Sequence, residues 1–100
     1  MRLEFTAAAE LELDEAVSYY DGQRAGLGRE FATEVSRAAD RILEYPHAWQ
    51  QLGDDVRRCQ LSRFPYGLVY SVEDGVTVVL AVMFLRREPS YWRDRLKARE

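Results

Sequence analysis

The chain has 100 residues and a mass of 11.6 kDa, which suits one domain with one hydrophobic core. Apolar residues make up 47% and charged residues 31% of it, a composition that excludes intrinsic disorder and collagen-like repeats. One cysteine, Cys59, and one histidine, His47, exclude an internal disulfide framework and the usual zinc and Ser-His catalytic sets. We therefore expect a single domain over residues 1–100 with no metal and no cofactor.

The formal net charge of −3 hides an asymmetry between the two halves of the chain. Residues 1–52 carry five basic and ten acidic side chains, whereas residues 53–100 carry nine basic and seven acidic ones. The basic C-terminal half can attract phosphate or carboxylate groups even though the whole protein is acidic. The first residues lack the apolar stretch of a signal peptide, and no run reaches the roughly 18 residues of a membrane span. We expect a cytoplasmic protein with no membrane partner.

A short strand followed by two helices is predicted for the N-terminal half. Residues 1–5 alternate between apolar and charged side chains, as in a strand with one buried face. Thr6 can cap a helix over residues 7–24, and the glycines within residues 25–28 separate it from a second helix that ends at Tyr45-Pro46. The apolar residues at helical spacing are Ala9, Leu13, Ala16, Val17 and Tyr20, then Leu27, Phe31, Val35, Ala38 and Ile42. The helices form an antiparallel hairpin with acidic outer faces.

The hydrophobic period changes from helical to alternating at Val56. Strands are predicted at residues 56–63, 66–72 and 76–85, and Asp74-Gly75 between the last two is a hairpin turn signal. Strands joined by such short turns form an antiparallel meander. Together with the N-terminal strand and the helix hairpin, they predict an α+β fold.

The last predicted strand, residues 76–85, is apolar on both faces, whereas an antiparallel strand with one wet face alternates. The helix hairpin can cover one of these faces. The other needs a cover, either from Tyr91 and Trp92 in the C-terminal segment or from a partner protein, because large bare apolar patches are uncommon on monomers. Pro89 can start a short helical tail, and we expect residues 91–100 to end loosely ordered.

Three other positions are interpreted from the same pattern. Arg57 and Arg58 point to opposite faces of their strand, so at most one lies in a given site, and the other is expected to pair with a carboxylate. Cys59 is expected to be a small core residue.

Short motifs spread over nearly the whole chain carry a resemblance to a known family. They are Ser18-Tyr19-Tyr20, Phe31, Tyr45-Pro46, Val56-Arg57-Arg58, Arg63-Phe64-Pro65-Tyr66-Gly67-Leu68-Val69-Tyr70 and Arg86-Arg87-Glu88-Pro89-Ser90-Tyr91-Trp92-Arg93-Asp94-Arg95. In this order they resemble the RelE/ParE superfamily of toxins from bacterial type II toxin–antitoxin modules, which includes plasmid stabilisation proteins. The resemblance implies a short strand, a helix hairpin and an antiparallel sheet. It also implies a growth inhibitor that a cognate antitoxin neutralises.

The resemblance leaves the cellular target open between two branches of the superfamily. One branch is similar to ribosome-dependent endoribonucleases that cut messenger RNA, and the other to proteins that bind DNA gyrase and trap it on DNA. A nontoxic degenerate homologue is a further alternative. Cleaving RNA requires a base for the 2′-hydroxyl, fixed cations for the phosphorane and an acid for the leaving oxygen. The candidates for these roles are Arg58, Arg63, Arg86 and Arg87 for the phosphate, and Tyr91 for stacking or proton donation.

Two departures from the family pattern favour the binding type of toxin. RNA-cleaving relatives commonly carry a basic residue where this chain has Gly67, and many carry a histidine where it has Phe84. The candidate residues for binding the antitoxin or target are Arg57, Phe84, Arg86, Arg87, Tyr91 and Trp92. We expect the antitoxin to cover apolar surface near the last strand and to engage the arginines with carboxylates. The second partner is the target, either DNA gyrase or the ribosome with its messenger RNA.

Overall fold

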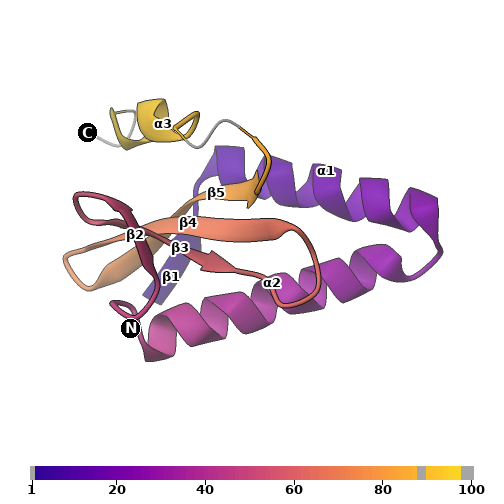
Figure 1. Ribbon diagram of the computed structural model, residues 1–100, viewed down its shortest axis with the longest axis horizontal. Helices are drawn as coiled ribbons and strands as arrows, with labels where there is room; N and C mark the ends of the chain where they lie inside the picture. The colour runs from indigo at the N-terminus through magenta and orange to yellow at the C-terminus, as the bar shows by residue number, and fades with distance from the viewer. Residues whose placement is uncertain (1, 88–89, 98–100) are drawn as a thin grey trace.

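The computed structural model describes residues 2–87 and 90–97 as a sheet with a helix hairpin on one face (Figure 1). The elements in chain order are β1 (Arg2–Phe5), α1 (Ala7–Gln23), α2 (Leu27–Glu44), β2 (Gln50–Gly53), β3 (Val56–Gln60), β4 (Tyr66–Glu73), β5 (Val76–Phe84) and α3 (Arg93–Lys97). The strands lie in the order β1-β5-β4-β3-β2, so β5 is internal, as expected. The predicted α+β fold is confirmed.

The sheet differs from the predicted meander in two ways. Strand β1 pairs with β5 in parallel, with Leu3 opposite Thr77, whereas the other pairs are antiparallel. The edge strand β2 was not predicted, because the segment Gln50–Gly53 has no alternating apolar pattern. This strand forms through its backbone pairing with β3. The strand predicted at 56–63 ends earlier, at Gln60.

The residues at the N-terminus of each helix of the hairpin explain where that helix begins. The Thr6 hydroxyl accepts a hydrogen bond from the backbone N–H of Ala9 (3.1 Å), which confirms the predicted cap of α1. Gly26 adopts a φ of +89° before α2, and the Asp21 carboxylate accepts from the backbone N–H of Gly28 (2.9 Å). A Cβ at Gly28 would lie 2.5 Å from the carbonyl oxygen of Val17, so only glycine lets the two helices approach this closely.

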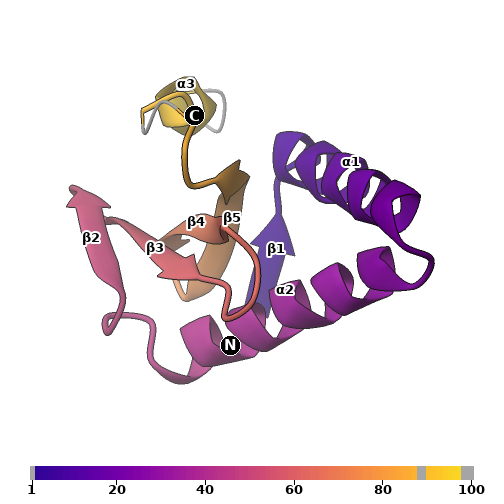
Figure 2. The same ribbon diagram turned by 45° about the vertical axis from the view of Figure 1, so that its right-hand side comes forward.

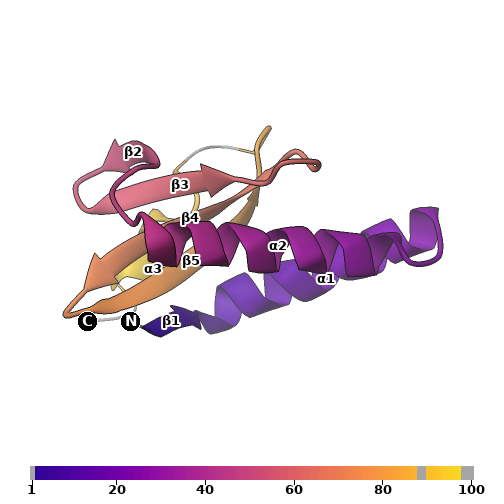
Figure 3. The ribbon, with the colours of Figure 1, turned by 90° about the horizontal axis from the view of Figure 1, so that it is seen from below.

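The first face of the sheet packs against α1 and α2 around a cluster of aromatic rings. Tyr20 stacks on Phe31 with 5.3 Å between ring centroids, and Phe64 and Tyr66 meet Phe31 edge to face. Cys59 is fully buried in this core, as expected. The turn between the helices reaches past the end of the sheet, as the view from below shows (Figure 3).

The second face of the sheet is covered by the C-terminal segment, residues 90–97, which lies opposite the helix hairpin (Figure 2). Trp92 is 1% exposed and packs with Leu80, Ala81 and Met83. The C-terminal segment of the chain therefore covers the second apolar face of β5, which is one of the two possibilities that the sequence left open. The predicted short C-terminal helical tail is confirmed by α3. The expectations for Pro89 and for a loosely ordered chain end fall on residues outside the described ranges. Over the described ranges, no helix has the length and hydrophobicity to cross a bilayer.

Candidate binding site at the end of the last strand

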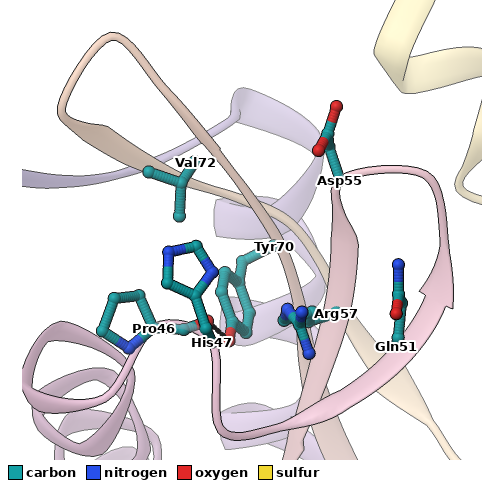
Figure 4. Close-up of a pocket in the computed structure, with 7 residues that line it drawn as sticks. All are labelled: Pro46, His47, Gln51, Asp55, Arg57, Tyr70 and Val72. Atoms are coloured by element: carbon teal, nitrogen blue, oxygen red, sulfur yellow. Dashed lines mark hydrogen bonds between the residues drawn. The ribbon is translucent and has the colours of Figure 1, made fainter.

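Arg57 ties the loop after α2 to the sheet. Its Nη1 donates to the carbonyl oxygen of Trp49 (2.8 Å). Figure 4 shows the buried Tyr70 beside Arg57, with its hydroxyl donating to the carbonyl oxygen of Pro46 (2.5 Å). A small cavity of about 80 Å³ remains here, next to the exposed His47. Arg57 lies opposite Tyr70, four residues or about 13 Å along β4 from Tyr66. The structure therefore separates Arg57 from the other residues predicted to bind a partner.

Arg58 lies on the opposite face of the sheet from Arg57, as the alternation predicted. Its Nη2 donates to the side-chain oxygen of Gln50 (2.6 Å). Among the described residues, no carboxylate pairs with Arg57 or Arg58, although one of the two was expected to have such a partner. The aliphatic part of Arg58 crosses Gly67, where an added Cβ would lie 2.9 Å from the Arg58 Cγ. A larger residue at position 67 would therefore force Arg58 to move. The glycine at position 67, where RNA-cleaving relatives commonly carry a basic residue, therefore leaves room for the side chain of Arg58.

Arg63 is engaged on the outer side of α2. Its Nη2 donates to Glu30 (2.7 Å), and Arg24 donates to the other oxygen of the same carboxylate (3.0 Å). These two hydrogen bonds hold the pKa of Glu30 below its usual value. Arg63 shares this single carboxylate with Arg24, and the pocket that it lines on α2 contains neither Tyr91 nor Arg87.

Tyr91 and Arg87 form a cluster with two residues that the sequence analysis missed, Glu12 and Arg95. The Tyr91 hydroxyl donates to Glu12 (2.8 Å), and Arg95 donates to both oxygens of the same carboxylate (2.8 and 3.1 Å). The guanidinium of Arg87 lies 4.0 Å from the centre of the Tyr91 ring. Burial, and then the hydrogen bond to Glu12, raise the pKa of Tyr91 well above its usual value. The Tyr91 hydroxyl proton is therefore engaged with Glu12.

An open groove lies between α1 and the end of β5, and we call it the aromatic groove. It consists of two adjoining hollows of about 260 and 580 Å³, both lined by Tyr19, Tyr66, Phe84 and Arg87. Tyr19 is 59% and Phe84 39% exposed, which is unusual for large apolar side chains. The groove brings together three of the predicted binding residues: Phe84, Arg87 and Tyr91.

The remaining predicted residues lie outside the groove. Trp92 is buried on the second face of the sheet, and Arg86 is exposed beside Arg87 in sequence. Of the five nuclease candidates, only Arg87 and Tyr91 line one pocket, whereas Arg58 and Arg63 lie elsewhere. Within the described ranges, no three acidic, histidine or cysteine side chains are placed to hold a metal ion.

Comparison with known proteins identifies the family. A family model described as the ParE toxin of the type II toxin–antitoxin system parDE matches residues 3–89. The chain belongs to the ParE toxin family. It is therefore the toxin of a type II parDE toxin–antitoxin system, and the predicted RelE/ParE relationship is confirmed.

A solved structure has the same fold. It is described as the chromosomal ParDE TA system from P. aeruginosa, with a TM-score of 0.65 and 16% sequence identity. The match covers 86% of this ParE chain and 97% of the solved one. At this identity the likeness shows a shared fold. No curated protein matches the chain with significance.

Proposed function

We propose that this ParE toxin inhibits growth by binding a protein target in the cytoplasm, with DNA gyrase the first candidate, and that it does not cleave RNA. The observation that carries the proposal is the separation of the nuclease candidates. Arg58 is bonded to Gln50, Arg63 to Glu30 and Tyr91 to Glu12, in three different parts of the molecule.

Cleavage of RNA needs several of these groups around one phosphate. Donors must lie within about 3 Å of the oxygens on which negative charge develops, and a base must reach the 2′-hydroxyl. The guanidinium groups of Arg87 and Arg95 lie 4.0 and 5.0 Å from the centre of the Tyr91 ring, and that of Arg95 is paired with Glu12. The Glu12 oxygens already receive donors from Tyr91, Arg95 and the backbone N–H of Val82. Both Glu12 oxygens are therefore engaged by donors of the protein itself. The groove is better suited to binding than to catalysis.

The aromatic groove is also our proposed site for the cognate antitoxin. Its walls offer the exposed rings of Tyr19 and Phe84 to an apolar side chain, and Arg87 offers a guanidinium to a carboxylate. An acidic antitoxin segment with an apolar anchor would satisfy both. If the target uses the same rings, the antitoxin neutralises the toxin by occupying them.

The proposal is tested by expressing the toxin in cells and mapping transcript ends together with a DNA-damage reporter. We expect a damage response with intact transcripts. Arg87→Ala should reduce growth inhibition about tenfold or more, since a charged hydrogen-bonding partner is lost. Arg29→Ala removes an equally exposed arginine on α2, away from the groove, and serves as the control.

Two results would overturn the proposal. Transcript cuts at the ribosomal A site, lost in Arg87→Ala, would assign the toxin to the nuclease branch. Absence of growth inhibition at any level of expression would instead indicate the nontoxic homologue.

A further inference from the structure

The structure assigns Glu12 of α1 as the residue that positions the C-terminal segment to form one wall of the aromatic groove. Four hydrogen bonds converge on this carboxylate. Oε1 accepts from the backbone N–H of Val82 (3.0 Å) and from Nη1 of Arg95 (2.8 Å). Oε2 accepts from the Tyr91 hydroxyl (2.8 Å) and from Nη2 of Arg95 (3.1 Å).

The setting makes these contacts strong. The side chain of Glu12 is 13% exposed and that of Arg95 22%, so water screens the pair much less than it screens the surface pairs elsewhere on the molecule. The hydrogen bond to Glu12 and the nearby negative charge raise the pKa of Arg95. Without the Glu12 carboxylate, the largely buried guanidinium of Arg95 would lose an acceptor. The backbone N–H of Val82 in β5 would lose its acceptor as well. Arg95 would keep its bond to the carbonyl oxygen of Leu80 (2.9 Å) and its contact with the Tyr91 ring, 5.0 Å from the ring centre.

The Glu12 carboxylate thereby holds the C-terminal segment in place at both the aromatic groove and the second face of the sheet. Tyr91, which it holds directly, lines the aromatic groove, and Arg87 rests on the Tyr91 ring. The next residue, Trp92, is buried on the second face of the sheet. If Glu12 released the segment, the groove would lose its Tyr91 wall and the sheet would lose part of its cover.

Closure of the segment and binding in the groove are consequently coupled. A partner that contacts Tyr91 and Arg87 in their present positions binds the closed segment better than the released one, so it must also stabilise closure. This step rests on the proposed function, because it takes the antitoxin as the partner. The positioning of the segment itself does not depend on that assignment.

The first experiment measures amide hydrogen exchange in the full chain for Glu12→Gln and for the control Asp14→Asn. Asp14 lies on the same helix, is exposed and has no part in the groove. Glu12→Gln should speed exchange in residues 91–97 on the order of tenfold to a hundredfold, as loss of a charged hydrogen-bond acceptor predicts. Asp14→Asn should leave these rates unchanged.

A milder variant keeps the test decisive if Glu12→Gln fails to fold. Tyr91→Phe removes the hydroxyl alone and should produce a smaller increase confined to the same segment. Unchanged exchange in residues 91–97, or an equal increase throughout the chain, would overturn the positioning role.

The second experiment measures the affinity of each folded variant for the protein encoded by the neighbouring reading frame, well below the melting temperatures. Glu12→Gln should weaken binding about tenfold, and Asp14→Asn should not. A purely structural role would lower the melting temperature and leave the affinity of the folded protein intact. Faster local exchange with unchanged affinity would support the positioning by Glu12 and refute the groove as the antitoxin site.

Discussion

Replacing Trp92 with alanine removes the largest side chain that covers the second face of the sheet. Trp92 is almost fully buried against Leu80, Ala81 and Met83. A buried tryptophan withdraws on the order of 200 Å² from water, which corresponds to about 5 kcal/mol at roughly 25 cal/mol per Å². Such areas are upper bounds, and neighbouring side chains can settle into part of the space. We therefore expect the free energy of unfolding to fall by about 3–4 kcal/mol.

The assay is urea unfolding followed by far-UV circular dichroism and by the fluorescence of the remaining Trp49. A loss of this size should lower the melting temperature by about 15–20 °C in a domain of this length. Tyr45→Ala is the control, because Tyr45 is among the exposed large apolar side chains and its removal should change the free energy by less than about 0.5 kcal/mol. A loss below about 1 kcal/mol for Trp92→Ala would refute the reasoning and leave the cover of β5 to a partner.

Two further changes test the hairpin and the loop after α2. Gly28→Ala should destabilise the protein by about 1–3 kcal/mol in thermal melts, because its Cβ would lie 2.5 Å from a backbone oxygen of α1, whereas Gly22→Ala, with no atom within 4 Å, should not destabilise it. Burial raises the pKa of Tyr70 to about 12 from an ordinary value of 10.0, so the folded chain holds this proton more tightly than the unfolded chain. The resulting stability, on the order of 2 kcal/mol, is complete below pH 10 and is lost as the pH rises to 12. The urea midpoint should fall over that window, and it should fall less in Tyr70→Phe; equal declines would contradict the assignment.

The hydrophobic periodicity of the sequence was sufficient to predict those helices and strands whose burial follows a regular pattern. The recurrence of apolar residues placed both helices, and the absence of a polar face in β5 showed that a second cover was required, which Trp92 supplies. The edge strand β2 could not be found in this way, because Gln50–Gly53 owes its conformation to pairing with β3 and not to its own composition.

The site depended on contacts that no local pattern encodes. Glu12 and Arg95 are 83 residues apart, and Glu12 looks in sequence like any other acidic residue on a solvated helix face. The family motif did locate Arg87 and Tyr91, and the departure from the family pattern drew attention to Phe84; the three residues meet in one groove. It could not show that Arg58 and Arg63 bond to neighbours in other parts of the fold.

The most direct measurement places the purified toxin with purified DNA gyrase and, separately, with ribosomes translating a defined messenger RNA. We expect the toxin to bind gyrase and to inhibit its supercoiling of DNA, Arg87→Ala to weaken both effects, and the messenger RNA to stay intact. Cleavage of the messenger RNA by the parent toxin, with no effect on gyrase, would contradict this expectation.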